Sequence, residues 1–149
     1  MTILDKIIAF KKKEIAKIKA EVPVKKLVES PNFSRQPLSL KKSLLTVGST
    51  GIIAEYKRQS PSKGIINDKA TIAEVTNGYL DANVAAQSIL TDTSFFGGTM
   101  ADLMEARVIN QQIPILRKDF VVEAFQIVES KAIGADFILL ISACFTWEL

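Results

Sequence analysis

Short apolar runs alternate with amphipathic segments from residue 51 onward, and this alternation constrains the fold more than any other feature of the sequence. The apolar runs begin near residues 52, 85, 113 and 137. Helical periodicity between them favours helices over about 71–81, 99–110 and 123–133. Buried strands that alternate with helices are typical of βαβ units, whose strands lie parallel. The sequence therefore predicts an α/β fold with a parallel sheet of four strands.

The segment before these units has a helical pattern of its own. Apolar residues recur there at near-helical spacing, at Leu4, Ile7, Ile8, Ile15 and Ile18. Lys11 interrupts this apolar stripe, and Pro23 is expected to end the helix. A short second helix is expected over 24–28, whereas the prolines and serines of 30–50 favour a loop or lead-in.

Two architectures contain four strand–helix units of this kind. One is a small, doubly wound open sheet, and the other is half of a parallel (βα)8 TIM barrel, which typically needs about 250 residues. In the barrel interpretation the chain is a single partial domain, with a helical extension at 1–50 and the first half of the barrel at 51–149. Residues 144–149 then open a further helix, with Trp147 packed on one of its faces. Composition does not decide between the two architectures, but the motifs do.

The chain has no histidine and one cysteine, and these counts exclude several kinds of active site. A Ser-His-Asp or Cys-His nucleophile is impossible, and so is a zinc site built on histidine. Acid–base chemistry must therefore use Lys, Glu, Asp or Tyr. Cys144 cannot form an intrachain disulfide, so we expect a packed thiol and a cytoplasmic location.

Charge and hydropathy argue against nucleic-acid and membrane partners. The formal charge of +3 comes from the lysines of residues 1–20 and is not spread over a domain surface. No apolar run reaches the roughly 18 residues of a membrane-spanning helix. The N-terminal segment also lacks the cleavage site of a secretory signal.

The segment from Ile53 to Gly64 joins an apolar run to a polar loop. Side chains alternate along a strand, so Ile53, Glu55 and Lys57 are expected to share a face. In a barrel, Glu55 and Lys57 then lie at the C-terminal rim, where barrel enzymes hold their active sites. The alternative is an ion pair that ends the strand. Residues 60–64 predict either a loop that covers a substrate or a plain surface loop.

A second lysine with the same parity follows a later apolar run. Leu116, Lys118 and Phe120 alternate, so Lys118 is also expected to face the centre. A lysine near a second cationic group is one source of a proton donor in a chain without histidine. The alternative is a solvated Lys118 that pairs with Asp119.

Two phenylalanines stand beside a glycine-rich turn. Phe95 and Phe96 precede Gly97–Gly98, and Thr99 is a natural N-cap for the helix that follows. One aromatic ring in this position can stack on a planar substrate, and at least one of the pair is expected in the core. Glycines at a helix start also attract phosphate, although this signal is weak by itself.

Taken together, these segments resemble the indole-3-glycerol phosphate synthase family, the (βα) barrel enzymes of tryptophan biosynthesis. The matching stretches are IIAEYKRQSPSKGII, SILTDTSFFGGT, PILRKDF, Gln126 and GADFILLI. They follow one another in the family's order and spacing, over essentially the whole chain. The resemblance favours the barrel over the open sheet.

The resemblance implies a lyase reaction. The family converts 1-(2-carboxyphenylamino)-1-deoxyribulose 5-phosphate to indole-3-glycerol phosphate, with release of CO2 and water and without a metal or organic cofactor. The partner it implies is thus a phosphorylated small molecule, not nucleic acid or a membrane. By resemblance, Lys118 is the general acid, and Glu55 and Lys57 are catalytic residues of the first strand. The substrate-binding residues implied are Ser60, Pro61 and Ser62 in a mobile loop, and Phe96, Phe120 and Leu139 in an apolar wall.

The family barrel continues for roughly another hundred residues, which carry further catalytic groups and the phosphate-binding loops. We therefore expect the 149-residue chain alone to be inactive. Two other interpretations stay open. One is a half-barrel without catalytic function that associates with itself through exposed edges. The other is a related phosphate-binding barrel, such as a phosphoribosylanthranilate isomerase.

Overall fold

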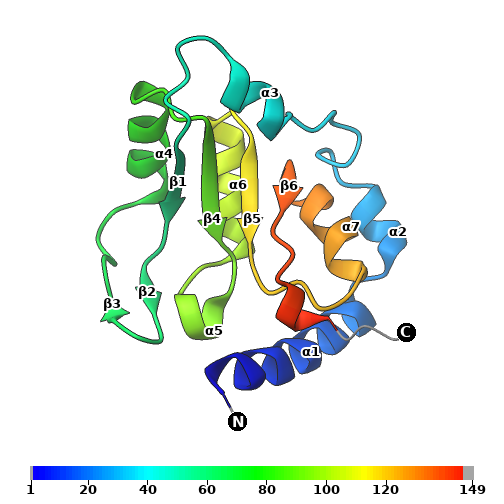
Figure 1. Ribbon diagram of the computed structural model, residues 1–149. Helices are drawn as coiled ribbons and strands as arrows, with labels where there is room; N and C mark the ends of the chain where they lie inside the picture. Colours follow the sequence, from blue (N-terminus) through cyan, green and yellow to red (C-terminus); the bar gives the residue numbers. More distant parts are fainter. Residues whose placement is uncertain (1, 146–149) are drawn as a thin grey trace.

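A sheet of four parallel strands organises the computed structural model, which describes residues 2–145 (Figure 1). The strands are β1 (Ile53–Tyr56), β4 (Ala86–Leu90), β5 (Ile115–Lys118) and β6 (Phe137–Ile138), and they pair in the order β1-β4-β5-β6. All three pairings are parallel, so the predicted parallel sheet of an α/β fold is confirmed. The fourth strand is shorter than the apolar run at 137–141 that predicted it.

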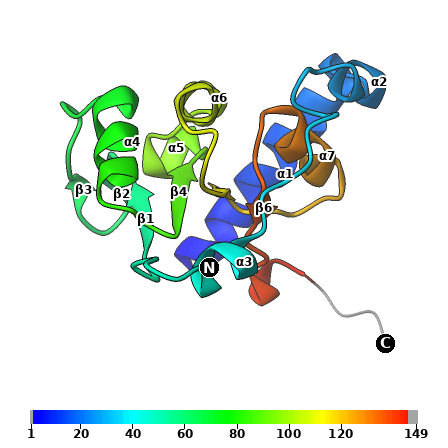
Figure 2. The same cartoon turned by 90° about the horizontal axis from the view of Figure 1, so that it is seen from above.

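Three helices between the strands cover one face of this sheet (Figure 2). They are α4 (Ile72–Asp81), α6 (Met100–Ile109) and α7 (Phe125–Ala132), each within the range that the sequence predicts. Alternation along the strands sends Tyr56, Ile89 and Ile115 to this face, where they join the buried core. The other core residues are Ile72, Leu103, Ala106, Ile133 and Ala135. The arrangement is that of the first strands and helices of a (βα)8 barrel.

The N-terminal segment forms three helices, of which two lie at opposite ends of the strands and one packs beside α7. These helices are α1 (Ile3–Glu21), α2 (Val24–Val28) and α3 (Leu40–Leu45). The first lies across the C-terminal ends of the strands in Figure 1, and the third lies at their N-terminal ends, where Ser43 Oγ donates a hydrogen bond to the carbonyl of Ala85. The prediction of a loop over 30–50 is wrong at α3, because Ser39 caps this short helix by accepting a hydrogen bond from the Lys42 N–H.

The loop after β1 contains an antiparallel ribbon that the sequence did not predict. It consists of β2 (Gln59–Ser60) and β3 (Gly64–Ile65), with Gly64 at φ 64° where β3 begins, directly after the turn. A glycine tolerates this left-handed conformation without a steric penalty, so the turn can be tight. Residues 59–65 are therefore an ordered hairpin on the surface. A short helix, α5 (Thr93–Phe96), follows β4 in the same region.

The opposite face of the sheet carries no layer of helices. Ile53 is 43% exposed on this face, and Ile52 and Leu140, next to the edge strands β1 and β6, are 55% and 59% exposed. β1 and β6 each have one strand partner, so both edges of the sheet are unpaired within residues 2–145. In this part of the chain, no helix has the length and apolar character needed to cross a membrane.

The C-terminal end of the described chain is a single 3₁₀ turn, η1 (Ser142–Cys144). The Cys144 thiol is buried as the sequence predicts, and its burial raises its pKa. The predicted helix opening at 144–149 and the packing of Trp147 lie outside the described residues, except for the first two positions.

Candidate active site

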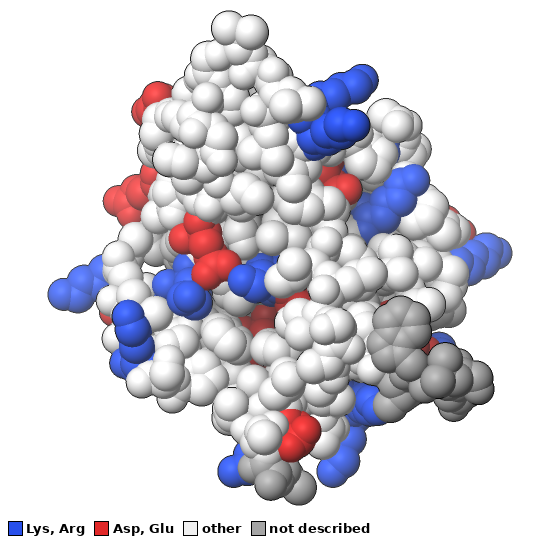
Figure 3. Space-filling model, in the orientation of Figure 1, with Lys and Arg blue, Asp and Glu red and all other residues white. Residues whose placement is uncertain are grey.

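Two lysines and one glutamate meet at the C-terminal ends of β1 and β5. Lys57 Nζ lies 3.0 Å from Glu55 Oε1, and Lys118 Nζ lies 3.0 Å from Glu55 Oε2. Acidic and basic side chains meet near the centre of the face shown in Figure 3, at this end of the strands. One carboxylate thus bridges two ammonium groups from different strands. These three residues, Glu55, Lys57 and Lys118, are called the bridged triad below.

The sheet register explains why the triad forms although β4 separates β1 from β5. Glu55 lies opposite Ser88 of β4, and Leu90 lies opposite Lys118 of β5. The small Ser88 side chain leaves room for the ion pair to span the middle strand, and its Oγ donates a 3.2 Å hydrogen bond to Glu55 Oε2. Tyr79 of α4 donates its phenol proton to the Glu55 carbonyl at 2.8 Å, which fixes the end of β1.

The charges of the triad control the ionisation of its carboxyl group. Burial raises the pKa of Glu55, but hydrogen bonds from Lys118 and Lys57 outweigh this effect and hold the pKa below its usual value. Glu55 is therefore a carboxylate at neutral pH, in contact with two proton donors. Such a group orients ammonium donors and can exchange a proton with them, while the ammonium groups attract an anionic ligand.

Of the two local alternatives, the ion pair of Lys57 is present and the pairing of Lys118 with Asp119 is wrong. Lys57 does pair with its neighbour Glu55, but the same carboxylate also reaches a second strand, so the contact is more than a strand-ending ion pair. Lys118 does not pair with Asp119. The Asp119 side chain points to the opposite face and contacts Arg117 and Lys11 instead, because consecutive strand residues alternate in direction.

Two adjoining hollows lie beside the triad. The smaller, of about 100 Å³, is lined by Glu55, Lys57, Leu90, Phe96, Lys118, Asp119, Phe120 and Ile141. The larger, of about 490 Å³, is lined by Ile3, Leu4, Ile7, Lys57, Ser60, Pro61, Ser62, Lys63, Ile66, Phe96 and Phe120. Lys57, Phe96 and Phe120 belong to both linings. Charged groups and aromatic rings therefore share one continuous site, which suits a ligand that has an aromatic part and an anionic part.

Two phenylalanines form the apolar wall of this site. The ring centroids of Phe96 and Phe120 are 5.9 Å apart, with the rings tilted by 36°. Phe95 faces the other way and packs edge-on against Phe10 of α1, at 5.7 Å and 88°. Neither Phe95 nor Phe96 is fully buried or part of the core cluster, so the expectation that at least one of them lies in the core is wrong.

Of the sequence-predicted site residues, Leu139 alone lies outside both linings. It follows β6 and is 39% exposed, whereas Ile141, two residues later, lines the smaller hollow. The sequence analysis missed the contribution of α1, whose residues Ile3 and Ile7 line the larger hollow. It also missed Arg58, which donates a 3.1 Å hydrogen bond to the Gly97 carbonyl and ties the hairpin loop to the turn after α5.

Known proteins resemble this chain over almost its whole length. The family model for indole-3-glycerol phosphate synthase matches residues 4–149. A protein of that name from Bacteroides thetaiotaomicron is 42% identical over 146 residues, which cover 98% of this chain and 55% of the relative. The synthases of Polynucleobacter asymbioticus and Paracidovorax citrulli are 41% and 40% identical, each over 95% of this chain and 56% of the relative.

The chain thus spans about half the length of the curated relatives that it matches. The matches favour the synthase family over the isomerase alternative, and the site residues lie within the matched range. The resemblance predicted from the motifs is confirmed: the chain belongs to the indole-3-glycerol phosphate synthase family.

Proposed function

We propose that this chain supplies the first half of an indole-3-glycerol phosphate synthase. The complete enzyme would close the indole ring of 1-(2-carboxyphenylamino)-1-deoxyribulose 5-phosphate, with loss of CO2 and water. The observation that carries this proposal is the bridged triad beside the Phe96–Phe120 wall. It combines proton donors, anion-binding charge and an aromatic surface at the C-terminal rim, where barrel enzymes perform their chemistry.

In this mechanism, Lys118 is the general acid. A carbon of the aromatic ring attacks the substrate carbonyl, and Lys118 gives its proton to the carbonyl oxygen, which becomes a hydroxyl group. The bond to the ring carboxylate then breaks, CO2 leaves, and the electron pair restores the aromatic ring. In the final step the hydroxyl oxygen takes up a proton and leaves as water, the adjacent ring carbon loses its proton, and the carbon–carbon double bond of the indole ring forms. Glu55 holds Lys118 in place through the 3.0 Å ion pair, and Lys57 binds the substrate's anionic groups.

The substrate's aromatic ring would lie against an apolar wall of Phe96, Phe120 and Leu139. Phe96 and Phe120 line both hollows, which supports this role for them, whereas Leu139 would have to approach from the segment after β6. Ser60, Pro61 and Ser62 line the larger hollow from the β2–β3 hairpin, where they would cover the bound substrate. We propose that the reaction uses no metal or organic cofactor and takes place in the cytoplasm.

An indole-fluorescence assay tests the proposal. The chain is assayed alone, and then mixed with the C-terminal half of the Bacteroides thetaiotaomicron synthase, which supplies the part of the barrel that this chain does not span. We expect no product from either half alone and indole-3-glycerol phosphate from the mixture. A covalent fusion of the two halves serves where mixing alone does not assemble them. A folded fusion without activity would refute the proposal, and activity of the isolated chain would refute the need for the second half.

A second candidate function is self-association of the chain. Ile53 is exposed on the uncovered face, Ile52 and Leu140 are exposed next to the edge strands β1 and β6, and both sheet edges are unpaired in the described residues. Open edges and apolar patches favour pairing with another copy. We expect sedimentation of the purified chain to give a dimer or larger species, which Ile53→Lys should weaken. A monomer at all concentrations would contradict this candidate.

A further inference from the structure

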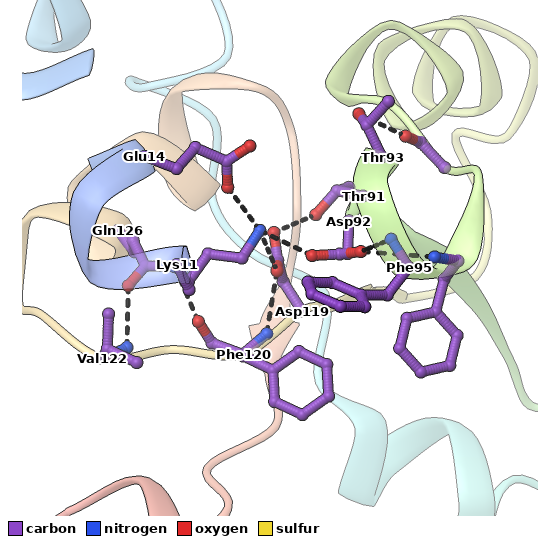
Figure 4. Close-up of polar contacts among 12 residues, drawn as sticks. Lys11, Glu14, Thr91, Asp92, Thr93, Phe95, Asp119, Phe120, Val122 and Gln126 are labelled. Atoms are coloured by element: carbon purple, nitrogen blue, oxygen red, sulfur yellow. Dashed lines mark hydrogen bonds and ion pairs between the residues drawn. The ribbon is translucent and has the colours of Figure 1, made fainter. Parts of the chain in front are cut away.

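A buried lysine of α1 lies outside the proposed mechanism and yet contacts the loops that carry the aromatic wall. Lys11 is 1% exposed, and its Nζ lies 2.6 Å from Glu14, 2.9 Å from Asp92 and 3.1 Å from Asp119. Figure 4 shows the Lys11 ammonium group pointing from the helix toward these carboxylates. Asp92 follows β4 and Asp119 follows β5, so one side chain joins the ends of two neighbouring strands.

The two aspartates also hold the backbone of the wall phenylalanines. Asp92 Oδ1 accepts hydrogen bonds from the N–H groups of Phe95 at 2.7 Å and Phe96 at 3.3 Å. Asp119 Oδ1 accepts a 2.8 Å hydrogen bond from the N–H of Phe120. Each carboxylate therefore links Lys11 on one side to a wall residue on the other. The spacing of the two rings, 5.9 Å between centroids, is set by loops that meet at this single ammonium group.

Electrostatics make the charged form of Lys11 necessary. Burial lowers the pKa of Lys11, but Asp119, Glu14 and Asp92 outweigh it and raise the pKa above its usual value. For Asp119, burial raises the pKa, but the positive charges of Arg117 and Lys11 outweigh this effect and bring the pKa below its usual value. Without Lys11, the buried carboxylate of Asp92, whose side chain is 1% exposed, loses its ammonium partner. An unpaired buried charge is costly, so the loops must rearrange to relieve it.

We propose that Lys11 is a positioning residue for the aromatic part of the ligand: it fixes the gap between Phe96 and Phe120 through Asp92 and Asp119. This inference rests on the proposed function, because the ring site is the aromatic subsite of that reaction. The Lys11 ammonium group contacts carboxylates and not the rings of Phe96 and Phe120. The bridged triad is held by ion pairs that do not include Lys11. Loss of Lys11 should therefore weaken binding of the aromatic ring more than it slows the chemical step.

Hydrogen exchange on the 149-residue chain tests the structural part of the inference. Lys11→Met removes the ammonium group and keeps an apolar stem, and Lys12→Met is the matched control because Lys12 is exposed on the same helix. We expect amide exchange in Lys11→Met to accelerate more at Phe96 and Phe120 than at Ile89 and Ile115 of the core strands. Lys12→Met should leave all four amides unchanged. Equal acceleration at all four in Lys11→Met means general destabilisation, and no change at Phe96 and Phe120 means no positioning; either result overturns the inference.

Kinetics of the completed enzyme test the functional part. In Lys11→Met we expect KM to rise about 2- to 5-fold, as for a weakened aromatic contact, with kcat within about twofold of the parent. Loss of folded protein alone would lower kcat and leave KM unchanged. An inactive parent counts against the proposed function, whereas an active parent with an unchanged KM in Lys11→Met counts against this inference.

A second variant covers the case in which Lys11→Met does not fold. Asp92→Asn keeps the oxygen that accepts the Phe95 and Phe96 amides and removes one charge that Lys11 binds. We expect the same direction of change, a higher KM with kcat retained. Binding of N-methylanthranilate, measured by its own fluorescence, should weaken in parallel in both variants. Unchanged affinity and KM in Asp92→Asn would contradict the role assigned to Lys11.

Discussion

Two clusters of charged residues lie at the same end of β5, and they differ in burial and in the face of the sheet that they occupy. Lys118 belongs to the bridged triad, whose side chains are 29–33% exposed. Its neighbours Arg117 and Asp119 belong to a buried cluster with Glu129 and Lys11. The side chains of Arg117, Asp119 and Glu129 in this cluster are at most 4% exposed. Alternation along a strand is the whole reason for the difference, because it sends consecutive residues to opposite faces. One strand end thus provides both reactive groups and their rigid support.

The two clusters should respond differently to mutation. A partly exposed ion pair contributes only about 0.2–1 kcal/mol to stability, because water screens it. Removal of one member of a buried pair costs about 3–5 kcal/mol, because the remaining charge stays without a partner. Changes in the bridged triad should therefore affect turnover with little effect on folding, whereas changes in the buried cluster should affect folding more than turnover.

The largest effect is expected from Lys118→Ala in the completed enzyme. Loss of a positioned general acid lowers turnover by about 10²- to 10⁴-fold, while the free energy of unfolding should change by less than about 1 kcal/mol. Single-turnover kinetics and urea unfolding measure the two quantities. Lys69→Ala is the control, since this exposed lysine lies outside both hollows. Turnover like that of the parent would remove Lys118 from the mechanism.

The converse change is Asp119→Ala in the buried cluster. Asp119 contacts Lys11 and Arg117 and accepts a hydrogen bond from Thr91 Oγ1 at 2.7 Å. We expect a loss of about 3–5 kcal/mol in the free energy of unfolding, measured with urea. Glu55→Gln, in the exposed triad, should cost less than about 1 kcal/mol under the same conditions. Similar losses in the two variants would mean that the clusters do not differ as their burial indicates.

The contrast also shows how far the sequence alone predicts the molecule. Four strands, three helices and the shared direction of Glu55 and Lys57 follow from periodicity, because strand and helix repeats determine which residues share a face. The meeting of Lys57 and Lys118 around one carboxylate required the family resemblance as well, since the order of strands in the sheet is not encoded in any single motif. The contact also depends on the small Ser88 of β4, which lies between the two strands and donates a hydrogen bond to Glu55.

Other features depend on contacts between distant segments and could not be predicted. Lys11 interrupts an apolar stripe, which was a visible signal, but its partners Asp92 and Asp119 lie far along the chain. One alternative in the sequence analysis paired Lys118 with Asp119 because they are adjacent, whereas the structure separates them by face. Helix α3 and the β2–β3 hairpin are too short to have a recognisable period, so only local caps and turns mark them.

The pH dependence of stability should separate the clusters further. The folded-state pKa of Asp119 lies below its unfolded value of 3.8, so its contribution to stability is present above that pH and is lost as the pH falls through the folded pKa. We expect the free energy of unfolding to fall below about pH 4, and to fall less steeply in Asp119→Asn. Glu55→Gln should change this slope less, because the Glu55 carboxylate is more exposed. Identical slopes in the parent and Asp119→Asn would exclude Asp119 as the source.

The smallest expected effect tests the same division on adjacent residues of α5. Phe96 faces the hollow and Phe120, and Phe95 faces α1 and Phe10. Because an aromatic contact is worth about 0.5–1.5 kcal/mol, Phe96→Ala should raise the KM of the completed enzyme by about 2- to 10-fold with kcat retained. Phe95→Ala should leave KM unchanged and lower the free energy of unfolding more than Phe96→Ala does. If Phe95→Ala raises KM and Phe96→Ala does not, the wall of the ring site is Phe95 and not Phe96. The assignment of the two phenylalanines to the hollow and to α1 would then be wrong.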